Sequence, residues 1–237
     1  DTTPEGEQVN IYGNHVGSWN FAATAYLNRW KVKIYYEHYF DDHSQMFFQY
    51  GRWKDGHIGL EITFPKNRFI DTFVYEGLGT KDQTGPMLYD SFWGEFEEQI
   101  SAKDNYYNHY LYQGWQHWGM GIGNPLLPGP IYNKNGQITF ISNRVLAHHI
   151  GFCGSPCQSL SYRMLLSYSR HWGTYDNPLN EIKKQFNSLF EVTYAPQQLK
   201  GWSFTVSGAM DRGNILGNNY GGMLVIRKQG IIKSGNK

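Results

Sequence analysis

The stretch WKVKIYYEHYF, residues 30–40, alternates strictly between two kinds of side chain. The first set is mainly apolar and comprises Val32, Ile34, Tyr36, His38 and Phe40. The second set is mainly polar and comprises Lys31, Lys33, Tyr35, Glu37 and Tyr39. Successive side chains of a strand point to opposite faces, whereas a helix would scatter them, so this pattern predicts a β-strand with one apolar and one polar face.

The same alternation recurs in three further stretches, HIGLEITF (57–64), LSYRMLLSYSR (160–170) and GWSFTVSGAMDRG (201–213). Other strand candidates are Asn20–Asn28, Gln45–Tyr50, Phe69–Leu78, Val145–Phe152, Phe190–Ala195 and Gly222–Lys228. Turn-forming residues between these runs predict about ten antiparallel strands joined in sequence. The best helical candidate is Asn180–Leu189, which is short and polar. Because strands do not alternate with helices, the fold class is all-β.

Composition narrows the protein class. Aromatic residues make up 17% of the 237 residues and charged residues another 17%, and the net charge is +1. So many aromatics argue against a disordered chain, and so small a charge argues against a nucleic-acid partner. No apolar run reaches the roughly 18 residues of a transmembrane helix. We expect a single β-barrel domain over residues 1–237, with one long loop region at about residues 79–137.

Two architectures fit the alternation. A soluble sandwich turns its polar faces to water, whereas an outer-membrane barrel turns its apolar faces to lipid and its polar faces to the lumen. Aromatics near strand ends, as in the interfacial girdles of barrels, favour the membrane barrel; they are Trp30, Phe40, Trp172, Tyr175 and Trp202. In that barrel, the charged residues expected to face the lumen are Lys31, Lys33, Glu37, Glu61, Arg144, Arg163 and Arg170.

Several segments together resemble one family. They are NHVGSWNF (14–21), YYEHYFDDHSQMFFQYGRWKDGHIGLEI (35–62), YYNHYLYQGWQHWGMGIGNPLL (106–127), ISNRVLAHHIGFCG (141–154) and SYRMLLSYSRHWGTYDNP (161–178). In their amino-acid sequence and their order along the chain, they resemble the Wzi family of capsule-assembly proteins in Gram-negative outer membranes, in its Bacteroides-like branch. The resemblance covers roughly residues 14–228.

The resemblance implies an outer-membrane β-barrel of eighteen antiparallel strands that holds capsular or other surface polysaccharide, in effect as a membrane-embedded lectin. It implies no enzymatic activity and no cofactor. Its partners would be surface polysaccharide, outer-membrane lipid and other outer-membrane or capsule-export proteins. A membrane strand needs about 9–11 residues, so this chain supplies roughly ten strands. We therefore interpret it as the C-terminal portion of a larger barrel, with its signal peptide removed or upstream.

The richest set of candidate binding residues lies in the loop region. Sugar rings pack their C–H faces on aromatic rings, and their hydroxyls need polar partners at the rim. The candidate carbohydrate-binding residues are Tyr106, Tyr107, His109, Tyr112, Trp115 and Trp118. The amides that could serve the hydroxyls are Asn105, Asn108, Gln113 and Gln116. The alternative is that these aromatics only pack the loop against the barrel.

Other functions stay open as alternatives. One is an outer-membrane channel for small solutes or oligosaccharides, since a polar lumen serves both roles. Another is a soluble glycan-acting enzyme that uses carboxylates among Asp90, Glu95, Glu97 and Glu98. We expect no metal site, because neighbouring residues of a strand, such as His148 and His149, point to opposite faces. The Asp41-Asp42-His43 triplet is better explained as a turn.

The two cysteines, Cys153 and Cys157, flank Gly-Ser-Pro in CGSPC. Gly-Ser-Pro favours a turn. A disulfide across that turn would indicate an oxidising compartment, and two free thiols are the alternative.

Overall fold

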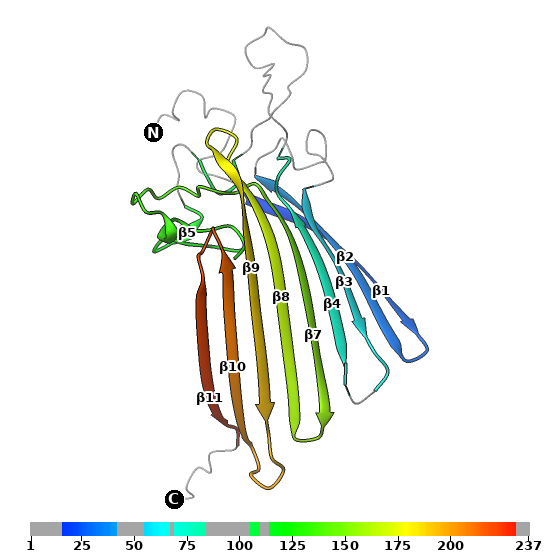
Figure 1. Cartoon of the computed structure of the whole chain (residues 1–237). Coiled ribbons are helices and arrows are strands. Elements are labelled where there is room, and N and C mark those ends of the chain that lie inside the picture. Colours follow the sequence, from blue (N-terminus) through cyan, green and yellow to red (C-terminus); the bar gives the residue numbers. More distant parts are fainter. Residues whose placement is uncertain (1–15, 42–54, 67–68, 84–104, 110–113, 231–237) are drawn as a thin grey trace, which may run out of the picture.

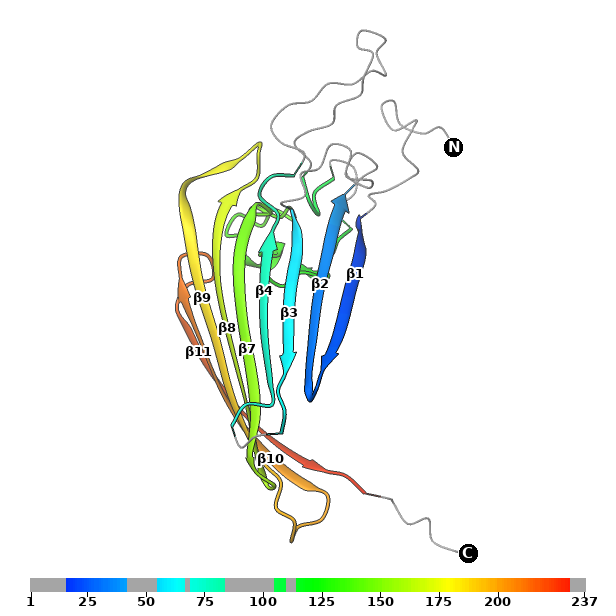
Figure 2. The same ribbon diagram turned by 90° about the vertical axis from the view of Figure 1, so that its right-hand side faces the viewer.

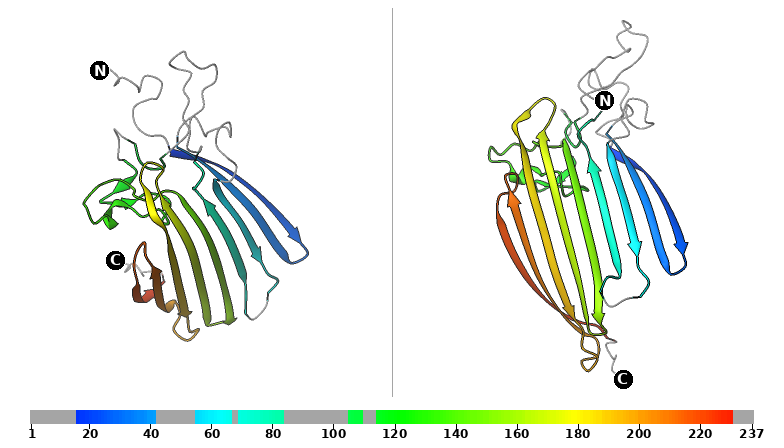
Figure 3. Two further views of the ribbon diagram at one scale, coloured as in Figure 1. Left: turned by 45° about the horizontal axis from the view of Figure 1, so that its top comes forward. Right: turned by 45° about the vertical axis from the view of Figure 1, so that its right-hand side comes forward.

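A nine-stranded antiparallel sheet forms most of the computed structural model, which describes residues 16–41, 55–66, 69–83, 105–109 and 114–230. In sheet order, the strands are β1 (Val16–Leu27), β2 (Trp30–Asp41), β3 (Gly56–Thr63), β4 (Thr72–Gly79), β7 (Val145–Cys157), β8 (Leu160–Gly173), β9 (Pro178–Tyr194), β10 (Trp202–Gly213) and β11 (Asn219–Lys228). The sheet forms a curved wall (Figures 1 and 3). The all-β antiparallel expectation is confirmed. Within the described ranges the sheet is open, with β1 and β11 at its two edges.

The faces of the sheet follow the predicted alternation. Directly opposed residues lie on one face, and Val32 is opposite Ile62, whereas Lys33 is opposite Glu61. We call the face that carries Glu37 the inner face, because residues 105–109 and 114–143 pack on it. The opposite, outer face carries the apolar sets.

The outer face leaves its large apolar side chains exposed. The exposed residues are Trp19, Phe21, Leu27, Trp30, Ile34, Ile58, Ile150, Tyr168, Ile182, Phe190, Tyr194, Trp202, Val206, Tyr220, Leu224 and Ile226. No described segment covers them. A water-soluble sandwich would bury this face against a second layer.

The apolar core lies on the inner side instead. It joins Leu78, Val145 and Ala147 of the sheet to Tyr107, Leu127 and Phe140. The last two belong to a segment, residues 114–143, that contains β5 (Gln116–His117), β6 (Met120–Gly121) and the short 3-10 helix η2 (Pro130–Tyr132). In Figure 2 this green segment lies behind β3, β4 and β7. The segment is therefore held against the inner face.

The connections differ between the two ends of the sheet. At the short-turn end, residues 28–29 join β1 to β2 and residues 158–159 join β7 to β8. At the opposite, long-connection end, residues 42–55 join β2 to β3 and residues 80–144 join β4 to β7. The two longest connections therefore lie at one end, as is typical of outer-membrane barrels, and residues 174–177 and 214–218 make short turns at that same end.

The helical candidate Asn180–Leu189 is wrong, because these residues lie within β9. From Lys183 onward they form ladder pairs with β8, and from Gln185 onward with β10 as well. Backbone pairing on both sides and burial of alternate side chains outweigh the weak local helix preference of a short polar stretch. The strand candidate Gln45–Tyr50 lies outside the described residues.

The CGSPC turn is also wrong. Both cysteines lie in β7, and the turn comes at residues 158–159. Cys153 is opposite Arg163 and Cys157 is opposite Leu160. Three positions along β8 span about 10 Å at ~3.4 Å per residue, which exceeds the ~7 Å that a disulfide can bridge between Cα atoms. Both thiols are accordingly free.

Two of the charges expected to face the lumen do not lie on the inner face. Arg170 shares the outer face with Tyr168, and its guanidinium lies 5.5 Å from the ring centroid of Trp172. Arg144 precedes β7 and stacks at 3.9 Å over the ring of Tyr175. In both cases a flat guanidinium packs on an aromatic ring near a strand end. The other five lie on the inner face by register: Lys31, Lys33, Glu37, Glu61 and Arg163.

Candidate functional site

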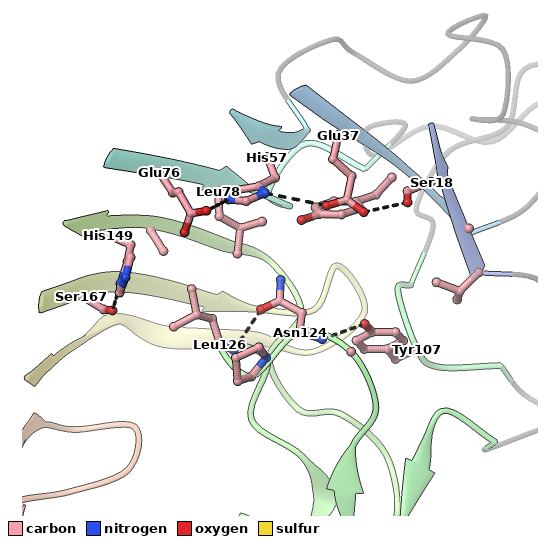
Figure 4. A pocket seen from close by; sticks show the side chains of 16 residues that line it. Ser18, Glu37, His57, Glu76, Leu78, Tyr107, Asn124, Leu126, His149 and Ser167 are labelled. Carbon is pink, nitrogen blue, oxygen red and sulfur yellow. Dashed lines mark hydrogen bonds and ion pairs between the residues drawn. The ribbon is translucent and has the colours of Figure 1, made fainter. Parts of the chain in front are cut away.

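A cavity of about 680 Å³ lies on the inner face near the long-connection end of the sheet. Its sheet side is formed by residues of β1 to β4, β7 and β8, and its opposite side by Tyr107 and residues 123–126. Figure 4 shows the two sides facing one another. The volume falls within the range of small-molecule sites, roughly 300–1,000 Å³.

Two carboxylates on either side of an imidazole cross the sheet side of the cavity. His57 Nδ1 lies 3.7 Å from Glu37 Oε2, and His57 Nε2 lies 3.4 Å from Glu76 Oε1. Figure 4 shows the three side chains in a row. The Ser18 hydroxyl donates a hydrogen bond of 2.7 Å to Glu37, and the Tyr35 hydroxyl donates to Glu76. These contacts fix both carboxylates at the edge of the cavity.

The polar row continues across the next strands. Glu76 of β4 is opposite His149 of β7, which is opposite Ser167 of β8. His149 Nδ1 and Ser167 Oγ are 2.6 Å apart. Asn187 of β9 is opposite Ser167, and its amide donates at 2.6 Å to Asp211 of β10. A continuous band of hydrogen-bonding groups therefore crosses the inner face.

The opposite side of the cavity is held together by contacts among its own groups. The Tyr107 hydroxyl accepts a 3.3 Å hydrogen bond from the backbone N–H of Asn124. The Asn124 side chain accepts from the N–H of Leu126 at 2.9 Å. The Tyr107 ring packs 5.1 Å from that of Phe140 and 6.5 Å from that of Trp115. Aromatic packing and local hydrogen bonds thus hold this side at a fixed distance from the sheet.

Asn143 anchors the short segment 105–109 that carries Tyr107. Its amide donates to Asn105 Oδ1 at 2.5 Å and to the Tyr106 carbonyl at 2.9 Å. Its own carbonyl accepts from the Thr80 hydroxyl at 2.6 Å. The two ends of the long connection are therefore tied together beside the cavity.

Asp55, which directly precedes β3, supports the same region. Its carboxylate accepts hydrogen bonds from the backbone N–H groups of Asp82 (2.9 Å) and Gln83 and from the Tyr106 hydroxyl (3.4 Å). The residue is 2% exposed. Burial raises the pKa of this carboxyl from 3.8 to about 6, although the three donors act in the opposite direction.

The candidate carbohydrate residues are separated by the fold. Tyr106 and Tyr107 are buried, and Tyr107 lines the cavity. Trp115 packs against the core, and Trp118 is 85% exposed at the β5–β6 turn. His109 lines a separate cleft of about 580 Å³, away from this cavity, with Asn105 and Asn108. Tyr112 lies outside the described residues, and a sugar contact by any of these side chains stays a prediction.

The candidate amides are engaged in local structure. Asn108 donates to Asn105 Oδ1 at 3.0 Å and to the Phe140 carbonyl at 2.8 Å. The Gln116 side chain accepts from the N–H of Gly119 at 2.7 Å. Gln113 lies outside the described residues, as do Asp90, Glu95, Glu97 and Glu98, so the carboxylate alternative for an enzyme is untested.

Histidines 148 and 149 point to opposite faces, as expected. His148 Nδ1 lies 2.8 Å from the Tyr75 hydroxyl, and His149 lines the cavity. In the part of the chain that the structure describes, no group of three His, Cys, Asp or Glu residues could hold a metal ion. Asp42 and His43 of the triplet lie outside it.

The alternation identified part of this site but not its assembly. It assigned Glu37 and His57 to the polar faces of their strands. Glu76 was missed because the faces of the Phe69–Leu78 candidate were not assigned, although alternation from Phe73 would have placed Glu76 opposite the apolar set. The meeting of Glu37, His57 and Glu76 depends on strand register, and the alternation excludes one-residue shifts without choosing among shifts of two residues.

None of the helices in the described ranges is long and apolar enough to span a membrane. The chain was compared with protein-family models, curated proteins and solved structures. None of them matches. The resemblance to the Wzi family therefore rests on the sequence segments alone.

Proposed function

We propose that this protein is a non-enzymatic outer-membrane β-barrel component that binds surface polysaccharide on its inner face, in the manner of a lectin. The observation that carries the proposal is the reversed polarity of the sheet. Large apolar side chains are exposed on the outer face, while the polar inner face carries the packed core and the cavity.

The outer face supports the membrane assignment. Exposed fractions reach 64% for Leu224, 61% for Val206 and 54% for Phe21. Contiguous apolar surfaces of this kind mark membrane or protein interfaces. Trp30 and Trp202 begin their strands at the short-turn end, and Phe40 and Trp172 lie near the long-connection end. Aromatics at both ends of an apolar band are typical of the two interfacial girdles of a membrane barrel.

The cavity supports the polysaccharide assignment. Tyr39 and Tyr107 line it, and Tyr39, which is only partly buried, offers aromatic surface to the C–H faces of sugar rings. Glu37, Glu76, His149 and Asn124 offer acceptors and donors to sugar hydroxyls. The long-connection end corresponds to the extracellular side of outer-membrane barrels, where surface polysaccharide lies.

The channel alternative receives less support. Residues 114–143 pack against the inner face and join its apolar core. In a barrel, that position lies within the lumen and narrows any pore. A channel through such a barrel would therefore be constricted at the level of Leu78, Val145 and Ala147.

The test uses the full-length protein in three assays on one preparation. We expect it to fractionate with outer membranes and to need detergent or nanodiscs to stay monodisperse. We expect the nanodisc form to bind at least one member of a panel of purified capsular polysaccharides, with no ion conductance in planar bilayers.

Glu76→Gln should lower that polysaccharide affinity by roughly tenfold, since one charge-assisted hydrogen bond contributes about 1.5–3 kcal/mol. Thr193→Ala is the matched control, because Thr193 lies on the inner face but outside the cavity and hydrogen-bonds Thr205 instead. A protein that is monodisperse in plain buffer contradicts the membrane assignment. Conductance without polysaccharide binding would favour the channel.

A further inference from the structure

A second, smaller cavity of about 260 Å³ adjoins the first one. The two cavities share Ser167 on the sheet side and Pro125 and Leu126 on the opposite side. The second cavity extends the first one toward β9, where Asn187 lines it. Both lie between the sheet and the same stretch of residues 123–132, so together they form one trough.

The floor of the trough runs across strands rather than along one. Its polar groups are Glu37 on β2, His57 on β3, Glu76 on β4, His149 on β7, Ser167 on β8 and Asn187 on β9. Neighbouring strands are about 4.8 Å apart, so this row spans roughly 24 Å. A monosaccharide is much shorter than this row, whereas a linear oligosaccharide could contact groups along its whole length.

Each cavity has its own aromatic surface. Tyr39 and Tyr107 line the larger cavity, and Tyr132 lines the smaller one. Tyr132 is 58% exposed, so its ring has open surface for a ligand. Two aromatic surfaces separated along one polar floor suit a polymer with repeating flat sugar faces better than a single compact ligand.

We propose that the smaller cavity is a second sugar subsite, and that the trough holds an internal stretch of a linear polysaccharide lying across strands β2 to β9. This inference rests on the proposed function. Sugar hydroxyls bond to the polar row, and ring faces pack on Tyr39 at one end and Tyr132 at the other. The larger cavity binds short fragments, and the smaller one contributes only when the ligand is long enough to reach it.

The experiment uses the polysaccharide from the panel that binds the protein most tightly. The polysaccharide is partly hydrolysed and separated into short and long oligosaccharides. Affinities of both fractions are measured for the protein in nanodiscs by titration calorimetry. We expect the long fraction to bind the unaltered protein at least roughly tenfold more tightly, because it gains contacts in the second cavity.

Variants at the two ends separate the subsites. Tyr132→Ala and Asn187→Ala should each weaken binding of the long fraction by roughly tenfold and leave the short fraction unchanged. Glu37→Gln, at the other end, should weaken both fractions. Thr193→Ala should change neither, and tryptophan fluorescence checks that each variant remains folded.

The outcomes distinguish this inference from the proposed function. Equal affinities of the two fractions for the unaltered protein would overturn the second subsite while leaving polysaccharide binding intact. So would a Tyr132→Ala variant that binds the long fraction normally. Because Tyr132 is 58% exposed, we expect this variant to fold, so that weaker binding reports the lost contact. If no member of the panel binds, the proposed function itself fails.

Discussion

Trp118 occupies a backbone conformation that few tryptophans adopt. It precedes Gly119 in the two-residue turn between β5 and β6, with φ of 52° for Trp118 and 79° for Gly119. Positive φ at both positions is the requirement of a type I′ turn, where Asn-Gly is the preferred pair. A tryptophan at the first position costs about 1–2 kcal/mol of backbone energy. Since Trp118 is also 85% exposed, packing does not explain its presence.

Replacing this residue should separate stability from binding. We expect Trp118→Asn to stabilise the β5–β6 turn by about 0.5–1 kcal/mol, because Asn tolerates positive φ. If Trp118 contacts polysaccharide, the same variant should bind it more weakly. Thermal unfolding and polysaccharide titration measure the two effects. Unchanged binding together with raised stability would remove Trp118 from the candidate sugar contacts.

Asp55 makes the stability of the region around the cavity depend on pH. Its pKa is raised in the folded state, so the folded protein holds the proton more tightly than the unfolded chain does. The stability from this group is therefore fully present below about pH 4 and is lost as pH rises through about 6. Its partners Gln83 and Tyr106 share the effect through their hydrogen bonds.

We expect hydrogen exchange at Gln83 and in segment 105–109 to become faster between about pH 4 and 6, after correction for intrinsic exchange. Asp55→Asn keeps a carbonyl acceptor for the backbone donors and cannot ionise, so its corrected rates should be flat over this range. If the Asp55→Asn variant shows the same change of exchange rate with pH as the unaltered protein, Asp55 is not the source of that change.

Among the strands, alternation was informative wherever one face had to be apolar. The faces assigned in residues 30–40, 57–64, 160–170 and 201–213 agree with the register of β2, β3, β8 and β10, apart from the lumen orientation expected of Arg170. The alternation failed in β9, where Lys183 and Lys184 on opposite faces obscure the pattern. It also carried no information on residues 80–144, whose course depends on long-range contacts such as that of Asn143 with Asn105.

Two adjacent leucines of β8 allow a matched test of the two faces. Leu166 is opposite Ile150 on the outer face, and Leu165 is opposite Gly151 on the inner face. In a bilayer, Leu166→Lys should destabilise the protein by about 2–4 kcal/mol, as a lysine near the membrane midplane does. Leu165→Lys should cost clearly less, because that position faces a polar interior. Urea unfolding in lipid vesicles measures both, and equal losses would contradict lipid contact at Leu166.

For the protein as a whole, the distribution of polarity is the main constraint on function. Its buried residues include many neutral polar side chains, among them Ser142, Asn143, Ser169 and Gln185. Many of its large apolar side chains are exposed. A hydrophilic interior beneath an apolar exterior suits lipid as the surrounding solvent. Composition alone could not show this, because a soluble sandwich with the same residues would have the same mean hydropathy.

The number of strands in the sheet also restricts how a barrel that contains it can close. Every neighbouring pair in the sheet is antiparallel, so strand directions alternate from β1 to β11, and the two edge strands run in the same direction. If β1 and β11 met directly, the seam would be parallel. A closed ring in which every seam is antiparallel has an even number of members. Any such ring that includes these nine strands therefore contains an odd number of others, whichever polypeptide supplies them.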